Sequence, residues 1–301
     1  MRILLFGITG QVGEELRSQD WGFPVELTAL GRPEADLAVP GNAGGAIRAA
    51  DPQLVINASA YTAVDKAESE PELAMAVNGV APGEMAKACA ELSIPLMHIS
   101  TDFIFDGAKE GPYSEDDPVK PLGVYGRSKA CGERAVREAL DHHIILRTAW
   151  VFSAHGRNFV KTMLRLGGER EELGVVDDQR GCPTPAAAIA GSLADIAKHI
   201  SSSKTVPWGT YHFCGAGDTS WYGFAKTIFE LAEPHMSRRP HVKPIATADY
   251  PTPARRPSNS VLVCAKLEAA FGIKPRPWRE GLTTVIERLF SQSNTAKEST
   301  S

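Results

Sequence analysis

Short apolar runs alternate with helical patterns along the first half of this chain. Residues 2–6 (RILLF), 25–30 (VELTAL), 53–59 (QLVINAS), 95–100 (PLMHIS) and 143–150 (HIILRTAW) have the length and composition of buried strands. Strands that are separated by helices at this spacing predict parallel β–α–β units. We therefore expect an α/β fold, a doubly wound parallel sheet of the Rossmann type. Helices on both faces would allow its strands to be apolar throughout.

Glycines cluster where the first predicted strand meets the first predicted helix, which we expect from Gln11 to about Ser18. Glycine permits a tight turn there and lets backbone N–H groups approach a pyrophosphate. Inside a β–α–β run, this loop predicts a dinucleotide site, with a plain tight turn as the alternative. The expected cofactor-binding loop consists of Gly7, Thr9, Gly10, Gln11, Val12 and Gly13.

The end of the second predicted strand bears on which dinucleotide is bound. Strict NAD use calls for an acid that binds the ribose hydroxyls there, but the sequence from Leu30 reads LGRPEADL. Arg32 can pair with the 2′-phosphate of NADP through two guanidinium nitrogens. A solvated arginine is the alternative. We expect NADPH as the cofactor, with NADH also open.

After Trp150 the alternation loosens, which suggests a second unit. We expect residues 1–150 to form the dinucleotide-binding domain, to which later segments return. Residues 151–289 would form mainly a smaller, C-terminal substrate-binding lobe. The proline-rich segment 250–260 has few free N–H groups and a stiff path, as an ordered loop over a site has. Residues 290–301 have almost no apolar side chains, so we expect a disordered tail.

Charge and cysteine usage exclude several classes of protein. The net charge of -4 and the pI of about 6.1 favour neither nucleic acid nor an anionic membrane as a partner. The five cysteines contain no CxxC pair, so we expect reduced thiols in the cytoplasm, without disulfides or a zinc site. No apolar run approaches the roughly 20 residues of a membrane helix, and the N-terminus reaches glycine too early for a signal peptide.

The segment GVYGRSKACGE, residues 123–133, sets Tyr125 and Lys129 four residues apart. On a helix both side chains lie on one face. A free phenol titrates near ~10, and a nearby ammonium would lower its pKa and make it a better proton-transfer group. Thr101 ends a predicted strand, at the edge where ligands bind in open parallel sheets. Alone, YxxxK occurs by chance in many helices, but a Ser or Thr at a strand end together with YxxxK resembles the short-chain dehydrogenase constellation. That resemblance implies Thr101, Tyr125 and Lys129 as the catalytic residues of a carbonyl reductase.

These patterns resemble the extended branch of the short-chain dehydrogenase/reductase superfamily. The likeness narrows to the dTDP-4-dehydrorhamnose reductase family through LLFGITGQVGEEL, TAVDKAESEPELA, STDFIFDG, VYGRSKACGE, RTAWVF, NFVKTMLRL, DDQRGCPT and YPTPARRPSNS. These segments extend from the first predicted strand to about residue 260. The resemblance implies reduction of the 4-keto group of dTDP-4-dehydro-β-L-rhamnose to dTDP-L-rhamnose.

The resemblance also implies roles for individual residues. Asp36 and Leu37 would flank the adenine, Lys129 would reach the nicotinamide ribose, and Asn78 would complete a proton path. Further cofactor contacts would be Ala58, Ser59, Ala60 and Tyr125. The implied substrate contacts are Thr101, Asp102, Trp150, Asn158, Lys161, Arg165 and Arg256.

Two positions depart from that family. Phe103 stands where many members carry a tyrosine, so one hydroxyl near the site is missing. Some members form dimers bridged by magnesium through three carboxylates; Glu15 and Glu287 fit two of these positions, but Ala187 stands at the third. Two carboxylates make a poor octahedral site. We expect no magnesium and a monomer, with a metal-free dimer also open.

Two other functions remain open on the sequence. A reductase or epimerase of a related nucleotide-linked 4-keto-deoxyhexose would carry the same motifs. A non-catalytic regulatory subunit can also use this fold, although it could lose the tyrosine or the lysine that this chain retains.

Overall fold

The computed structural model describes residues 1–298, with side chains as far as Ser291. Its centre is a six-stranded parallel sheet of order β10-β5-β4-β3-β1-β2. The strands are β1 Arg2–Phe6, β2 Glu26–Leu30, β3 Leu54–Asn57, β4 Leu96–Thr101, β5 His143–Thr148 and β10 Gly209–His212. Strand β1 lies between β2 and β3, so the strand order runs outward from β1 in both directions. The predicted doubly wound Rossmann-like sheet is confirmed.

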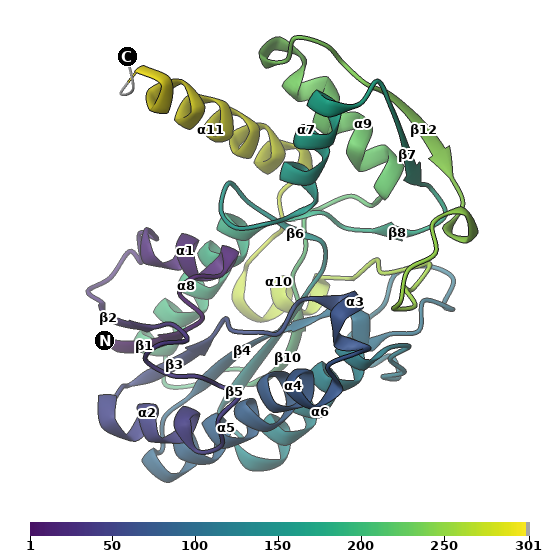
Figure 1. The fold of residues 1–301 in the computed structure, drawn as a ribbon. Coiled ribbons are helices and arrows are strands. Elements are labelled where there is room, and N and C mark those ends of the chain that lie inside the picture. The colour runs from purple at the N-terminus through teal and green to yellow at the C-terminus, as the bar shows by residue number, and fades with distance from the viewer. Residues whose placement is uncertain (299–301) are drawn as a thin grey trace.

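Helices cover both faces of the sheet (Figure 1). Side chains of successive strand residues point to opposite faces, so Leu5 belongs to one core and Leu4 to the other. The first core is closed by α1 Gln11–Arg17, α8 Ala186–Ser202 and α10 Ala265–Phe271, and the second by α2 Asn42–Ala50, α5 Ala81–Leu92 and α6 Val124–Ala139. With both faces covered, β3 is buried along its whole length.

A π-helical turn, η1 Ala76–Val80, separates α4 Pro71–Met75 from α5. Asn78 lies in this turn and is buried. Its side chain accepts from Tyr61 N (2.8 Å) and donates to Tyr61 O (3.0 Å) and to Ser128 Oγ (3.1 Å). Single π turns inside helices are frequent at functional sites. Here the turn ties the segment after β3 to α6.

A second lobe stands above the carboxyl ends of the strands (Figure 1). Its core packs three helices against a small parallel pair of strands. These elements are α7 Phe159–Glu169, α9 Trp221–Ala232, α11 Trp278–Glu298, β7 Glu172–Val176 and β12 His241–Ile245. The remaining short elements lie within the two lobes or between them: α3 Val64–Ala67, η2 Asp102–Ile104, β6 Val151–Phe152, β8 Arg180–Gly181, β9 Thr184–Pro185, β11 Thr219–Ser220, η3 Glu233–His235 and η4 Thr247–Asp249.

The chain returns to the sheet after residue 150, through α8, β10 and α10. At its other end, α11 is helical as far as Glu298, although the sequence predicted a disordered tail over residues 290–301. Phe290 packs against the core of the upper lobe, and no proline or glycine follows to end the helix. Residues 299–301 lie outside the described residues. No helix among residues 1–298 has both the length and the apolarity to cross a bilayer.

Candidate active site

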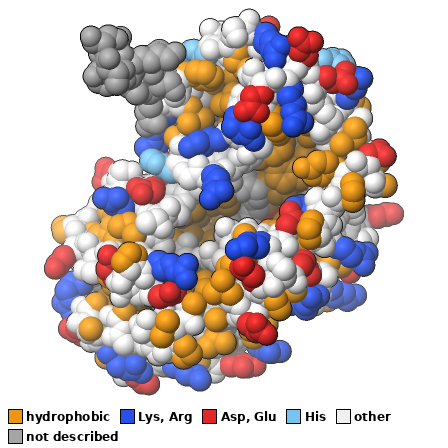
Figure 2. All heavy atoms as spheres, in the orientation of Figure 1, with side chains coloured by type: hydrophobic (Ala, Val, Ile, Leu, Met, Phe, Trp, Pro, Cys, Tyr) orange, Lys and Arg blue, Asp and Glu red, His pale blue; other side chains and the backbone are white. Residues whose placement is uncertain are grey.

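A cleft of about 900 Å³ separates the carboxyl edge of the sheet from the upper lobe, and Figure 2 shows the molecule hollowed between the two. The structure brings most of the predicted site residues to this cleft. They are Gly7, Thr9, Gly10, Gln11, Val12, Arg32, Asp36, Leu37, Ala58, Ser59, Ala60, Thr101, Asp102, Tyr125, Lys129, Trp150, Asn158 and Arg256. Gly13, Lys161 and Arg165 do not line it.

The glycine loop can have no side chain at two of its three glycines. Gly7 has φ of +93°, and a Cβ there would lie 2.6 Å from Ser59 N. A Cβ on Gly13 would lie 2.1 Å from Gly7 O, so Gly13 lets α1 pack onto the loop and stays behind the cleft wall. The loop is held by a bond from Gly7 N to Leu30 O (3.0 Å). This tight, backbone-lined turn fits a dinucleotide pyrophosphate.

The adenosine end of the predicted cofactor site lies where β2 ends at Leu30. Arg32 is largely exposed, and its Nε donates to Asp36 Oδ2 (3.1 Å). The backbone N–H of Ala38, and then the Arg32 guanidinium, lower the pKa of Asp36, so this carboxylate stays charged. Arg32 therefore has a partner already and must share its guanidinium with an added 2′-phosphate.

The predicted catalytic residues converge at one end of the cleft. Thr101 is the last residue of β4, where its Oγ1 donates to Asp102 Oδ1 (3.0 Å) and accepts from Phe103 N (3.2 Å). Tyr125 and Lys129 lie one turn apart in α6, both buried. The Tyr125 ring packs edge-to-face on Phe103, with centroids 5.5 Å apart. The phenol is thus fixed by its ring and not only by its hydroxyl.

The pKa of Tyr125 shifts opposite to the direction we expected. Burial raises it to about 12, and a hydrogen bond with the Thr101 hydroxyl only partly opposes the rise. Lys129 does not lower it, because the Lys129 ammonium is itself buried and donates to Ile99 O (2.7 Å). Burial lowers the pKa of Lys129 to about 8. In this structure Tyr125 is a neutral phenol at physiological pH, which is the form of a proton donor.

Lys129 is further surrounded by neutral groups on the sheet. His98 Nε2 lies 3.5 Å from Lys129 Nζ, and Asn57 Nδ2 lies 3.0 Å from His98 Nδ1. Burial, and then the charge of Lys129, keep the pKa of His98 well below its usual value, so His98 is neutral. Asn57, His98 and Lys129 therefore form a buried polar row across β3, β4 and α6 with a single charge.

Trp150 forms an aromatic wall on the upper side of the cleft. It follows β5 with a left-handed backbone, φ of +47°, which is rare for a bulky residue and occurs mainly at functional sites. Its ring stacks on Trp221 with centroids 3.5 Å apart. A Cβ on Gly181 would lie 2.4 Å from the Trp150 ring, so only glycine leaves room there. The strained backbone thus presents a flat indole to the cleft.

Arg256 reaches the cleft from the proline-rich segment 250–260. It pairs bidentately with Asp65, with Nη1–Oδ1 of 3.1 Å and Nη2–Oδ2 of 2.8 Å, and Asp65 Oδ1 also accepts from Ala254 N (3.2 Å). Arg256 lowers the pKa of Asp65. As predicted, the segment is an ordered loop across a site, and its anchor lies on α3 of the sheet domain.

The remaining predicted substrate residues differ in placement. Asn158 caps α7, accepting from Lys161 N (3.1 Å), and its amide faces the cleft wall. Lys161 lines a separate pocket of about 400 Å³ and donates to Ala154 O (3.2 Å). Arg165 pairs with Glu169 on the exposed side of α7. Lys161 and Arg165 lie about one and two helical turns after Asn158, and α7 leads away from the cleft.

The chain is similar to known proteins over nearly its whole length. Residues 1–291 match the family described as RmlD substrate binding domain. The chain is 46% identical to a dTDP-4-dehydrorhamnose reductase of Sinorhizobium fredii, over 98% of this chain and 100% of that protein. It is 40% identical to the Escherichia coli K12 reductase of the same name, over 97% and 99%.

The chain belongs to the dTDP-4-dehydrorhamnose reductase family.

Solved structures agree with this assignment. The Clostridium acetobutylicum dTDP-4-dehydrorhamnose reductase has a TM-score of 0.88 at 36% identity, covering 96% of this chain and 99% of that one. The Bacillus anthracis enzyme of that name, solved in complex with NADP, has a TM-score of 0.87 at 33% identity, covering 95% and 99%. The fold and the enzyme class expected from the sequence are therefore confirmed.

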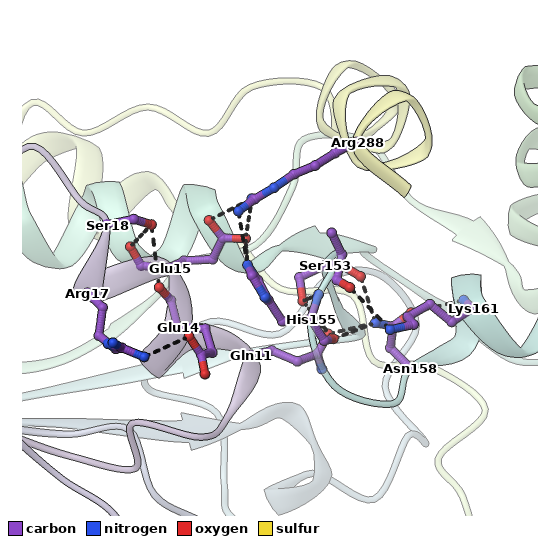
Figure 3. Close-up of polar contacts among 11 residues, drawn as sticks. Gln11, Glu14, Glu15, Arg17, Ser18, Ser153, His155, Asn158, Lys161 and Arg288 are labelled. Carbon is purple, nitrogen blue, oxygen red and sulfur yellow. Dashed lines mark hydrogen bonds and ion pairs between the residues drawn. The ribbon is translucent and has the colours of Figure 1, made fainter. Parts of the chain in front are cut away.

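Glu15 and Ala187, two of the three positions compared above with magnesium ligands, offer no open carboxylate. Glu15 is buried and bound by Arg288 Nη1 at 3.1 and 3.3 Å, with His155 Nε2 3.5 Å away (Figure 3). Ala187 lies in the first turn of α8 and offers no side-chain oxygen. Among the side chains that the structure describes, as far as Ser291, no three of histidine, cysteine, aspartate or glutamate gather as a metal site would require.

Several cleft residues were not predicted. In the sequence, Trp221 has the position of a core residue in an amphipathic helix. Its stacking on Trp150 is apparent only in the folded structure. Tyr61 donates to Glu70 (2.7 Å) on the cleft wall, and Glu70 also pairs with Lys66. Arg157 directly precedes the helix cap Asn158, a position at which a basic residue has no distinguishing signal in the sequence.

Proposed function

We propose that this chain reduces the 4-keto group of dTDP-4-dehydro-β-L-rhamnose to dTDP-L-rhamnose with NADPH. The observation that carries the proposal is the convergence of Thr101, Tyr125 and Lys129 on the cleft that also contains the glycine loop. The family assignment supplies the substrate. The Bacillus anthracis relative was solved with NADP, which supports the same cofactor here.

The glycine loop and the end of β2 would hold the dinucleotide. Gly7, Gly10 and the backbone of Gln11 would face the pyrophosphate, Leu37 and Asp36 the adenine, and Arg32 the 2′-phosphate. Ala58, Ser59 and Ala60 line the next stretch of the cleft, at the end of β3. When bound, NADPH supplies the hydride.

Tyr125 acts as the general acid of the reduction. Its phenol is protonated at neutral pH because burial raises its pKa to about 12. As negative charge develops on the substrate carbonyl oxygen, the phenol gives up its proton to that oxygen. Thr101 orients the phenol through a hydrogen bond. Lys129, one turn along α6, would reach the nicotinamide ribose of the bound dinucleotide.

The upper lobe would hold the nucleotide sugar. Trp150 and Trp221 offer a flat apolar surface, and Arg256 offers a guanidinium to the phosphates. Asp102, buried beside Thr101, and Asn158 would bind hydroxyl groups. Lys161 and Arg165, which do not line the cleft, would contribute only if α7 moved toward it.

The state of the cysteines bears on where the protein works. Free cysteines, of which Cys89, Cys182 and Cys214 are buried, are compatible with a reducing cytoplasm. We propose a cytoplasmic monomer, with a metal-free dimer as the alternative and with no nucleic acid or membrane as partner.

Product identification tests the function. The purified protein is incubated with dTDP-4-dehydro-β-L-rhamnose and either NADPH or NADH, while nicotinamide absorbance and product are followed. We expect oxidation of NADPH with formation of dTDP-L-rhamnose. Faster turnover of an epimeric nucleotide-linked 4-keto-deoxyhexose would reassign the substrate, and no oxidation with either sugar would reject the reductase.

A further inference from the structure

Five cationic side chains line the cleft: Arg32, Lys66, Lys129, Arg157 and Arg256. Four of them have partners already. Arg32, Lys66 and Arg256 form ion pairs with carboxylates, and Lys129 donates to a backbone carbonyl. Arg157, considered over the described residues, forms neither an ion pair nor a hydrogen bond. The cleft thus contains one guanidinium whose donors are all available to a ligand.

The loop that carries Arg157 is nevertheless well anchored (Figure 3). Gln11 Oε1 accepts from both Ser153 Oγ and Asn158 Nδ2, each at 3.0 Å. Ser153 Oγ accepts from His155 N (3.0 Å), and Asn158 Nδ2 also donates to Ser153 O (2.8 Å). Side chains at both ends of residues 153–158 are therefore bound to a single residue of the glycine loop.

A second set of contacts holds the same loop from its outer side. Arg288 of α11 lies between Glu15 of α1 and His155 of the loop, with Nη2 3.1 Å from His155 Nε2 (Figure 3). Gly156 follows, with φ of +60°, and a Cβ there would meet Gln11 Cγ at 3.5 Å. The backbone on the N-terminal side of Arg157 is thus packed directly against the start of α1.

A fixed backbone with a free guanidinium is the arrangement that recognises phosphate at low entropic cost, because only the side chain remains to be ordered. Guanidinium binds phosphate oxygens bidentately. We propose that Arg157 binds the diphosphate of a nucleotide in the cleft, as a binding residue additional to those predicted. The inference rests on the proposed function, in which both the dinucleotide and the nucleotide sugar carry this group.

The test compares nucleotide binding by Arg157→Met and Arg157→Lys with that of the unchanged protein. Arg170→Met is the matched control, because Arg170 is an exposed arginine at the C-terminal end of α7 and does not line the cleft. Calorimetry measures Kd for NADPH and for dTDP separately, at low and at high salt. We expect Arg157→Met to weaken one of the two by about 10-fold or more, as loss of a charged hydrogen bond does. Arg157→Lys should lose less, and high salt should narrow the difference.

The two titrations identify the ligand. Weakening confined to NADPH assigns Arg157 to the cofactor diphosphate, and weakening confined to dTDP assigns it to the substrate. Unchanged Kd values in both titrations overturn the inference, as does an equal loss in Arg170→Met. Because binding is measured without turnover, these outcomes stand apart from failure of the reductase assay, and an unaltered Tm excludes misfolding.

Discussion

Replacing Tyr125 by phenylalanine removes one oxygen from the candidate site and little else. The ring is held by its edge-to-face contact with Phe103 and by burial, both of which phenylalanine retains. The hydroxyl is the proton donor in the proposed reaction, and burial raises its pKa to about 12, so the donor form is fully populated at neutral pH. The substitution therefore separates chemistry from folding.

The size of the expected loss in kcat follows from the role of Tyr125 as the general acid. General acids contribute roughly 10²- to 10⁴-fold to rate, and the other titratable group bonded to Thr101, Asp102, has a pKa of about 6 and is mostly ionised at neutral pH. We expect kcat to fall about 100-fold or more. The lost hydrogen bond with Thr101 has a typical stability value of only about 1 kcal/mol, so the folded protein should persist.

Steady-state kinetics with dTDP-4-dehydrorhamnose and NADPH measures the loss, and calorimetric titration with NADPH checks that its Kd stays nearly unchanged. Tyr211→Phe is the matched control. Its hydroxyl is bonded to Pro207 O in the sheet domain, and Tyr211 does not line the cleft. Near-wild-type turnover in Tyr125→Phe would refute the assignment, and equal losses in both variants would point to structural damage.

Further predictions concern charge. Arg32→Ala should weaken NADPH selectively over NADH in calorimetric titrations, and an equal effect on both would place Arg32 outside the pocket. Burial raises the pKa of Asp102 from 3.8 to about 6, so the folded protein loses stability as pH rises from about 4 to about 6. Asp102→Asn should therefore have a higher Tm than the unchanged protein at about pH 8, and the difference in Tm should shrink toward pH 4. Burial lowers the pKa of Lys129 from 10.5 to about 8, so the folded protein gains stability as pH rises from about 8 to about 10.5. Lys129→Met should therefore raise Tm at neutral pH, while reductase activity falls. Activity should survive EDTA, and sedimentation should show no magnesium-dependent dimer, because Arg288 already neutralises Glu15.

The sheet domain was predictable because its signals are local. Each of its first five strands is a short apolar run followed by a helical pattern, and the glycine loop and the pair Tyr125–Lys129 depend on spacings of a few residues. Such signals need no knowledge of distant partners. The boundaries shifted by only a few residues, as at β5, which ends at Thr148 rather than at Trp150.

The partners of charged side chains could not be predicted, because they come from distant segments. Arg256 pairs with Asp65 across 191 residues, and Arg288 with Glu15 across 273. Helix α8 was also not predicted, since its alanine-rich start follows two prolines and carries a weak signal. The direction of the Tyr125 pKa shift depends on burial and on where Lys129 points, and neither is local in sequence.

Three buried groups of the candidate site have shifted pKa values, and burying such groups lowers the stability of the fold. Lys129, Asp102 and Tyr125 each have a pKa displaced mainly by burial, to about 8, 6 and 12. Burial without a counter-charge destabilises the fold for each group that is ionised at neutral pH. In contrast, the buried Arg147–Glu133 pair, with Nη2–Oε2 of 2.7 Å, lies outside the cleft and is fully matched. The fold can therefore compensate buried charge where it has only a structural role. It leaves charge only partly compensated at the end of the cleft, where a proton must move and a carbonyl oxygen must be stabilised.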